Sequence, residues 1–494
     1  MDWPSIWRFA PYFTEDGWTP ATVPFLQASL LFLTLVYVFE TYLDLRQHQK
    51  LKETKFPEPL ADAIRALDDA AAAPQKPSTE KNLNKDSEDN TSDDEDEASG
   101  EKPVSASLLD ATLEKFDKSC AYGLDQSTLK FFSCAYTHVQ ATALVLFGYL
   151  PFLWVVSGNA LTALGLDASN EICHSLMFFL LNLLREIVVK LPVDLYSTFV
   201  IEARHGFNKQ TVGIFFVDKL KLFLLLLGIC CPLIAGLVYL VRWGGEHFYV
   251  YVWAFKCAVT VFIATLLPLW ILPLLEKFTP LEEGELRTRL EALASSIKFP
   301  LTSISVVDGS TRSGHSSAYC AGLLKTQRIV IYDTLLEQIT NDEVVAVLAH
   351  ELGHWKLAHA LKGFLVEQVH DIAFAYIFGM CMNNSELYAS FGFAGDSGMP
   401  VMIGYMLFSK TVWAPVSHVL SFLLRLNTRR TEFQSDAFAV DLGHGETLKS
   451  ALTKVAIGNL TNMNPDPLYS KYHYDHPPLV ERLAAITART KKSM

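Results

Sequence analysis

Long apolar segments recur along the chain and are separated by shorter polar stretches. Seven of them are long enough to cross about 30 Å of hydrocarbon as helices. Half of the residues are hydrophobic and 12% are aromatic, as expected for a chain in a bilayer. The pattern predicts an all-α membrane protein with seven transmembrane helices. These helices are expected at Val23–Leu43, Thr142–Leu166, Cys173–Leu191, Leu222–Val241, Phe248–Leu275, Phe364–Met382 and Met399–Leu424.

Ionisable residues interrupt the third and sixth segments, at Arg185, Glu186, Glu367, His370 and Asp371. Such groups at membrane depth normally face a bundle interior or a water-filled cavity, because hydrocarbon does not solvate charge. We therefore expect an aqueous interior. For the sixth segment, an amphipathic helix lying in the membrane interface is the alternative.

The chain becomes polar between Ala61 and Lys102, where it is first rich in alanine and then strongly acidic. With so few apolar residues, burial cannot offset the entropy lost on ordering, so a disordered cytosolic loop is predicted. The loop supplies much of the net charge of −12. That charge therefore says little about partners, and no nucleic-acid partner is expected.

Loop charges predict the orientation in the membrane. Four basic residues between Arg46 and Lys55 follow the first apolar segment, whereas acidic residues predominate before it. The positive-inside rule then puts the N-terminus in the lumen and, after seven spans, the C-terminus in the cytosol. The final residues Lys491–Met494 have the form of a dilysine retrieval signal for the endoplasmic reticulum. The Asn-x-Ser sequon at Asn383 would be lumenal.

A more polar region between Glu276 and Asp342 contains three strand-like stretches. Ser303–Asp308 and Arg328–Asp333 are rich in β-branched residues, and Ser316–Cys320 is a third candidate. They predict a small sheet, which could bind an extended peptide by strand addition through main-chain hydrogen bonds.

The segment Asn341–His359 follows the predicted sheet and contains the pattern H-E-x-x-H at His350, Glu351 and His354. Apolar residues at helical spacing precede the pattern and predict a helix. Positions i and i+4 share a helix face, so the two imidazoles can bind one zinc ion. Glu351 then lies close enough to act as general base toward an attacking water.

A catalytic zinc site also requires a third protein ligand. Glu432 and Asp436 lie four residues apart in Asn427–Val440 and share one face of a predicted helix. Either could be the ligand, and the other could hydrogen-bond a ligand imidazole. An ordinary charged helix is the alternative.

Basic side chains gather around a Pro-Pro turn in Tyr472–Arg482. A histidine there could stabilise an oxyanion and Arg482 could pair with a carboxylate. A surface loop without a catalytic role is the alternative.

These features divide the chain into six parts. Residues 1–60 contain the N-terminus and the first transmembrane helix, residues 61–105 form the disordered loop, and residues 106–275 contain transmembrane helices two to five. Residues 276–360 form a cytosolic α/β metalloprotease portion, and residues 361–425 contain helices six and seven. Residues 426–494 form a C-terminal cytosolic portion with the third zinc ligand.

Seven stretches in this order resemble the type I CAAX prenyl proteases, which are integral-membrane zinc metalloproteases. The resemblance covers nearly the whole chain. The stretches are FETYLDLRQ (Phe39–Gln47), IEARHGFNKQT (Ile201–Thr211), KFTPLEEGELR (Lys277–Arg287), HSSAY (His315–Tyr319), VLAHELGHWKLAH (Val347–His359), RRTEFQSDAFA (Arg429–Ala439) and HYDHPPLVERL (His473–Leu483).

The resemblance implies seven helices around a water-filled chamber, with one Zn²⁺ at its cytosolic end. It implies His350, His354 and Glu432 as zinc ligands, Glu351 as general base, and Asp436 as a hydrogen-bonding partner behind the ligands. It further implies that seven residues face the substrate. These are His476 and Arg482, expected to be catalytic, and His315, Ser316, Ser317, Ala318 and Tyr319, expected to bind substrate.

Members of this family remove the last three residues of prenylated CAAX proteins, and fungal members also make an N-terminal cut in a lipidated pheromone precursor. The resemblance implies the same activity here, in the endoplasmic reticulum and the inner nuclear membrane, with prenylated proteins and membrane lipid as partners. Ser317 departs from the family, which usually has Asn there. A broader protease acting on unprenylated or translocation-stalled polypeptides is one alternative, and a catalytically idle scaffold or channel is another. The oligomeric state is left open.

Overall fold

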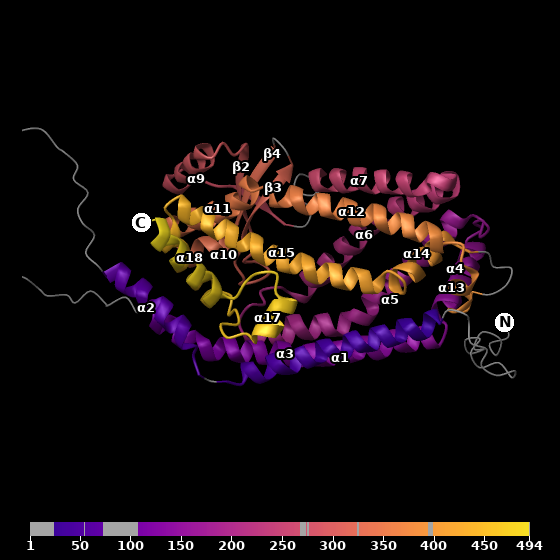
Figure 1. Cartoon of the computed structure of the whole chain (residues 1–494), viewed down its shortest axis with the longest axis horizontal. Coiled ribbons are helices and arrows are strands. Elements are labelled where there is room, and N and C mark those ends of the chain that lie inside the picture. The colour runs from indigo at the N-terminus through magenta and orange to yellow at the C-terminus, as the bar shows by residue number, and fades with distance from the viewer. Residues whose placement is uncertain are drawn as a thin grey trace, which may run out of the picture.

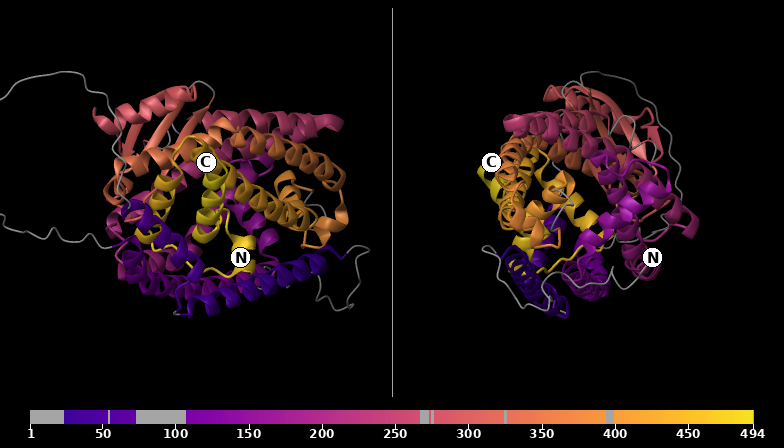
Figure 2. Two further views of the ribbon diagram at one scale, coloured as in Figure 1. Left: turned by 60° about the vertical axis from the view of Figure 1, so that its left-hand side comes forward. Right: turned by 90° about the vertical axis from the view of Figure 1, so that its right-hand side faces the viewer.

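The computed structural model describes residues 24–53, 55–72, 107–266, 273, 276–323, 326–393 and 399–493. The longest helices run along the long axis of the molecule (Figure 1). In the end-on view of Figure 2, they are arranged around the periphery. Together with the shorter α4 and α14, the bundle comprises α1 (Phe25–Leu51), α3 (Leu108–Leu146), α4 (Tyr149–Ala163), α5 (Glu171–Tyr196), α6 (Val212–Trp243), α7 (Phe248–Leu266), α12 (His359–Cys381), α14 (Val401–Lys410) and α15 (Ala414–Asp441).

Five helical segments in the described part of the chain are long and apolar enough to cross a membrane, or up to seven when each of two bent pairs counts as one span. Two of them include a short irregular turn, η3 (Ser197–Glu202) after α5 and η4 (Gly245–His247) before α7. Large apolar side chains face outward, such as Leu31 on α1, which is 62% exposed. The predicted membrane protein is confirmed, including the charged third and sixth segments.

The second and seventh predicted spans are each bent, which the sequence did not indicate. Helices α3 and α4 meet at 71°, where Gly148 adopts a left-handed backbone with φ of +64°. Helices α14 and α15 meet at 60°, and Pro415 in the first turn of α15 lacks the N–H needed to continue the preceding helix. The predicted spans Thr142–Leu166 and Met399–Leu424 therefore each contain two helices joined at a bend.

The expected disorder from Ala61 onward is also wrong for its first twelve residues, which lie in α2 (Glu58–Ala72). Leu60, Ile64 and Leu67 recur at helical spacing and are buried. Leu60 and Ile64 share a cluster with Phe116 of α3. The low apolar content of the segment as a whole concealed this one amphipathic face. The acidic stretch that follows lies outside the described residues, as do the first 23 residues.

A four-stranded sheet has the order β1-β2-β4-β3. All three strand predictions are confirmed, and β1 was missed because it is only three residues long. Strands β2 and β4 are parallel, whereas β3 is antiparallel to β4 and lies at the edge. The strands are β1 (Phe278–Pro280), β2 (Leu301–Val307), β3 (Ala318–Leu323) and β4 (Thr326–Tyr332).

The sheet packs with surrounding helices at one end of the bundle, around a core that includes Ile329, Ile331, Val344, Leu348 and Ala349. Helix α11 lies in this core, and all of its apolar face is buried there. The remaining helices are α9 (Glu285–Ser296), α10 (Asp333–Gln338), α11 (Asn341–Lys356), α13 (Ser385–Ala389), α16 (Gly445–Gly458), α17 (Pro467–His473) and α18 (Leu479–Ser493).

Removing the N-terminal cap of α11 should destabilise the protein. Thr340 Oγ1 accepts a hydrogen bond from the Glu343 N–H, and the Glu343 carboxylate accepts one from the Thr340 N–H. We expect Thr340→Ala to cost about 1 kcal/mol and to lower the thermal midpoint in detergent. Thr340→Ser keeps the hydroxyl and should retain the wild-type midpoint. Equal midpoints for the Ala variant and wild type would contradict a stabilising cap.

Candidate active site

Helix α11 presents the H-E-x-x-H residues near its C-terminal end. The helix stops after Lys356, and Ala358 has a left-handed backbone with φ of +54° before α12 begins at His359. This break lets α12 leave in a new direction. It also lets His359 Nδ1 approach His354 Nδ1 to 3.1 Å.

Helix α15 passes very close to α11 at this point. Gly353 lies between the two histidines, and a Cβ there would be 3.1 Å from the Cα of Ser435. A larger residue would therefore push α15 away. The absence of a side chain at Gly353 lets Glu432 approach the two imidazoles.

The predicted zinc ligands converge in the structure. His350 Nε2 lies 3.4 Å from Glu432 Oε2, and His354 Nε2 lies 3.2 Å from Glu432 Oε1. One ligand atom from each of the three residues lies within 4.8 Å of the others. Glu432, rather than Asp436, is thus the carboxylate positioned to complete the set.

This donor set fits a metal ion. Glu432 is only 3% exposed, and within the described part of the chain its Oε2 has no hydrogen-bond partner. A buried carboxylate oxygen without a partner is costly, and a bound cation would satisfy it. Two imidazole nitrogens and one carboxylate oxygen form the set that catalytic zinc prefers, with a fourth position left open.

Asp436 contacts the ring nitrogen of His350 that does not face Glu432. Its Oδ1 lies 2.8 Å from His350 Nδ1, which directs Nε2 of the same ring toward Glu432. Arg482 forms two hydrogen bonds to this carboxylate, at 2.6 and 2.9 Å. The guanidinium of Arg482 also lies 3.3 Å from His350 Nδ1 and 3.9 Å from Glu432 Oε2, so Arg482 contacts the ligand cluster directly as well as through Asp436.

Glu351 is half-buried next to the ligand cluster. Burial raises the pKa of its carboxyl group, while the charges of His350 and His354 act in the opposite direction. A carboxylate with a raised pKa accepts and returns a proton more readily near neutral pH. Its position and environment suit a general base.

His476 is on the open side of the site. Its side chain is 61% exposed, and its Nε2 lies 3.6 Å from Glu432 Oε1. Arg429 of α15 donates to the His476 carbonyl at 3.5 Å and to Glu481 at 2.9 Å, which anchors this loop. The sequence did not single out Arg429, although it lies three residues before Glu432.

His315 and Ser316, expected to bind substrate, have partners elsewhere in the fold. The His315 ring stacks on Phe207 at 4.0 Å, and its Nε2 lies 3.4 Å from Glu202 Oε2. Ser316 is buried, and its hydroxyl donates to Gln338 at 2.8 Å. Both residues join the start of β3 to the rest of the fold. Glu202 lies in the stretch IEARHGFNKQT that carries the family resemblance, but no role was predicted for it.

The following residues belong to the edge strand. Ser317 is exposed, and its carbonyl accepts a hydrogen bond from the Tyr332 N–H at 3.0 Å. Ala318 packs against the core beside α11, and Tyr319 pairs with Val330 of β4. The other edge of β3 has no strand beside it among the described residues. It can therefore hold an extended peptide near the metal ligands.

Comparisons with known proteins assign the chain to a family. A family model described as "CAAX prenyl protease N-terminal, five membrane helices" matches residues 47–277, and one for peptidase family M48 matches residues 280–490. The chain belongs to the M48 family of CAAX prenyl proteases. It is therefore a membrane metallopeptidase. This family assignment argues against the alternative prediction of a catalytically idle scaffold or channel.

M48 relatives similar to this chain span several kingdoms. A CAAX prenyl protease 1 homolog of Arabidopsis thaliana is 43% identical over 474 residues, which cover 95% of this chain and 99% of that protein. The human homolog is 40% identical over 421 residues, covering 78% of this chain and 88% of that protein. The crystal structure of S. mikatae Ste24p, at 33% identity, has a TM-score of 0.79 and covers 95% of this chain and 100% of that one.

Removing the carboxylate ligand should abolish metal binding, whereas changing its neighbour should weaken it. We expect Glu432→Ala to leave only two ligands and to lose the metal. Asp436→Asn should lower metal affinity about 10- to 100-fold, because His350 loses its charged partner. Metal content and competition with a chelator measure both effects.

Asp441→Asn is the matched control, since Asp441 lies on the same helix with its side chain 45% exposed. Thermal midpoints of all variants separate metal loss from unfolding. A Glu432→Ala protein that keeps a full complement of metal would show that the third ligand lies elsewhere.

Proposed function

We propose that this chain is a zinc endopeptidase that removes the C-terminal tripeptide from prenylated CAAX proteins. The observation that carries the proposal is the convergence of His350, His354 and Glu432 beside Glu351. The relatives named CAAX prenyl protease 1, which match almost the whole chain, support the substrate class.

Each residue of the site then has a chemical role. His350, His354 and Glu432 would hold one Zn²⁺, which polarises the scissile carbonyl and activates water. Glu351 takes a proton from the attacking water and later donates it to the leaving amine. His476, exposed beside Glu432, donates a hydrogen bond to the oxygen that becomes negative.

Other groups hold the substrate and the ligands in position. The free edge of β3 binds the peptide main chain by strand addition. Ser317 replaces the usual Asn of the family and offers a shorter side chain to the peptide. Arg482 fixes Asp436, and Asp436 fixes His350.

The membrane supplies the setting for this reaction. We propose the endoplasmic reticulum membrane, with a lumenal N-terminus, a cytosolic active site and an aqueous chamber between the helices. In Figure 1 the start of α1 lies at the opposite end of the molecule from α11, which supports this orientation. Asn383, exposed just beyond the end of α12, is a candidate lumenal glycosylation site.

A broader protease activity is the second candidate function. The edge of β3 that is not paired with another described strand would recognise main-chain groups, which every extended polypeptide offers. The same site could therefore cut unprenylated or stalled membrane polypeptides, or make an N-terminal cut in a lipidated pheromone precursor.

Replacing the general base should stop catalysis but leave the metal in place. We expect Glu351→Gln to lower kcat for a farnesylated CAAX peptide by about 10²- to 10⁴-fold, with unchanged zinc content by elemental analysis. Glu337→Gln, at an exposed position on α10, should behave as wild type. Normal turnover by the Glu351→Gln protein would overturn the assigned mechanism.

Prenylation should decide between the two candidate functions. We expect a farnesylated CAAX peptide to be cleaved with a higher kcat/KM than the same peptide carrying a free cysteine, because the prenyl chain adds buried apolar area. Both peptides are incubated with the wild-type protein in lipid vesicles and the products are identified by mass spectrometry. Equal kcat/KM for the two would favour the broader protease.

A further inference from the structure

The turn that follows η3 is joined to the loop that leads into β3. Gly206 has a left-handed backbone with φ of +83°, which reverses the chain after η3. Beyond it, the main chains of residues 207–209 and 312–314 are linked by two hydrogen bonds, of 3.0 and 3.1 Å. These bonds end directly before His315. The turn and the loop before β3 are therefore held together through their backbones.

A single carboxylate connects three segments at this place. Glu202, the last residue of η3, accepts a hydrogen bond at Oε1 from the Tyr122 hydroxyl of α3 at 2.6 Å. Its Oε2 lies 3.4 Å from His315 Nε2. An ionised carboxylate only accepts hydrogen bonds, so the imidazole is the donor. Glu202 thus ties α3 and η3 to the residue that leads into β3.

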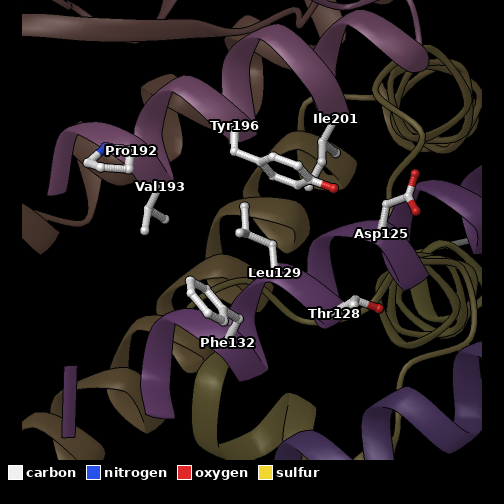
Figure 3. A pocket seen from close by; sticks show the side chains of 8 residues that line it. All are labelled: Asp125, Thr128, Leu129, Phe132, Pro192, Val193, Tyr196 and Ile201. Carbon is white, nitrogen blue, oxygen red and sulfur yellow. The ribbon is translucent and has the colours of Figure 1, made fainter. Parts of the chain in front are cut away.

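The packing of η3 against α3 is incomplete. A cavity of about 380 Å³ lies between α3 and the segment that runs from α5 into η3, and Ile201 of η3 is one of its lining residues (Figure 3). Asp125 of α3 also lines it, and the Oδ2 of Asp125 lies 2.7 Å from Arg204 Nη1 and 2.9 Å from His205 Nε2. Polar contacts, such as those of Tyr122 and Asp125, therefore contribute to the position of the turn.

The unpaired edge of β3 begins three residues after His315. The Ser317 carbonyl accepts a hydrogen bond from the Tyr332 N–H and so faces β4. Main-chain groups of successive residues in a strand point to opposite edges. Those of Ala318 and Cys320 therefore face the edge that has no strand beside it in the described part of the chain.

This edge lies beside the proposed general base. Ala318 and Cys320 pack against the core that contains α11. Burial and the nearby charge of Glu351 raise the pKa of the Cys320 thiol. A peptide paired with Ala318 and Cys320 would therefore pass close to Glu351.

Two side-chain contacts hold the residues just before the edge. Asn459 pairs with the N–H and the carbonyl of Ser316, at 2.9 and 3.1 Å, and Glu202 holds the adjacent His315. Asn459 lies in the part of the chain that matches the M48 peptidase model, whereas Glu202 lies in residues 47–277, which match the model with five membrane helices. Through Glu202, the membrane-helix part of the chain thus reaches the strand that would bind the peptide.

We propose that Glu202 is a positioning residue which, through His315, sets the place of the β3 edge at which the peptide binds. This inference rests on the proposed function and adds the part that the membrane helices play in peptide binding. Hydrogen bonds to the peptide main chain form in the bound substrate and persist in the transition state. Displacing the edge therefore raises KM and leaves kcat nearly unchanged.

Removing the Glu202 carboxylate tests this role. We expect Glu202→Ala to raise KM for a farnesylated CAAX peptide about 3- to 10-fold, equivalent to the loss of one hydrogen bond, with kcat close to that of wild type. Glu202→Gln keeps the shape and an accepting oxygen and should bring KM back toward the wild-type value. Tyr122→Phe removes only the hydroxyl and should raise KM less than Glu202→Ala. Zinc content and the thermal midpoint are measured for every variant.

N-methylated substrates report on the edge itself. The same farnesylated peptide is methylated at one main-chain nitrogen at a time, which removes one N–H from each version. In wild type, methylation at the residue that pairs with β3 should raise KM. In Glu202→Ala the same methyl group should raise KM by a smaller factor, because that hydrogen bond is already weakened. A loss of stability alone would change the amount of active protein and leave this factor unchanged.

Two control variants separate the Glu202 contact from its surroundings. Asp117→Asn changes an exposed carboxylate on α3. Asp125→Asn weakens the contacts of α3 with Arg204 and His205 on the same turn, and no contact joins Asp125 to His315 among the described residues. Both variants should have the wild-type KM for every peptide.

Each failure has its own meaning. If wild type cleaves the farnesylated peptide and Glu202→Ala has the same KM, the inference is overturned; if Glu202→Ala does not fold, the KM of Tyr122→Phe decides in the same way. An equal rise in Asp125→Asn, or N-methylation without effect in wild type, would also overturn it. If wild type cleaves no prenylated peptide, the proposed function itself fails.

Discussion

The contact between α11 and α15 is the constraint on which the site depends. Two of the proposed ligands come from one helix and the third from another, so the proposed metal site requires that these helices touch. Gly353 makes the approach close enough, since a Cβ there would already crowd Ser435. Ala439 and Val440 of α15 continue the contact into the core around α11. Packing, rather than any ionic interaction, therefore determines the spacing of the ligands.

Much of the site could be predicted because the residues of each pair lie only four positions apart in the sequence. The spacing of His350 and His354 places them on one helix face, and so does the spacing of Glu432 and Asp436. The choice between the two acids could not be made from spacing, because it depends on the depth at which α15 crosses α11. In the structure Glu432 lies level with both imidazoles, and Asp436 reaches only the back of the His350 ring.

The parts that sequence reasoning missed depend on distant partners or on single residues. One left-handed residue at Gly148 turns an apparently continuous apolar run by 71°. The stripe of Leu60, Ile64 and Leu67 is short enough to be hidden by the polar residues after it. His315 was expected to bind substrate because of the family resemblance, and its ring also has a partner in Glu202, more than a hundred residues earlier. No local pattern identifies such a pair.

The course of α15 has a consequence for how the protein is made. This helix continues without a break from Ala414 to Asp441, so the same element crosses the apolar zone and supplies Glu432. During synthesis the ribosome releases the two histidines about eighty residues before that carboxylate. A nascent chain that has completed α12 therefore has an incomplete ligand set. The metal site that we propose can therefore form only after α15 has been synthesised, once all the long apolar helices of the bundle have been made.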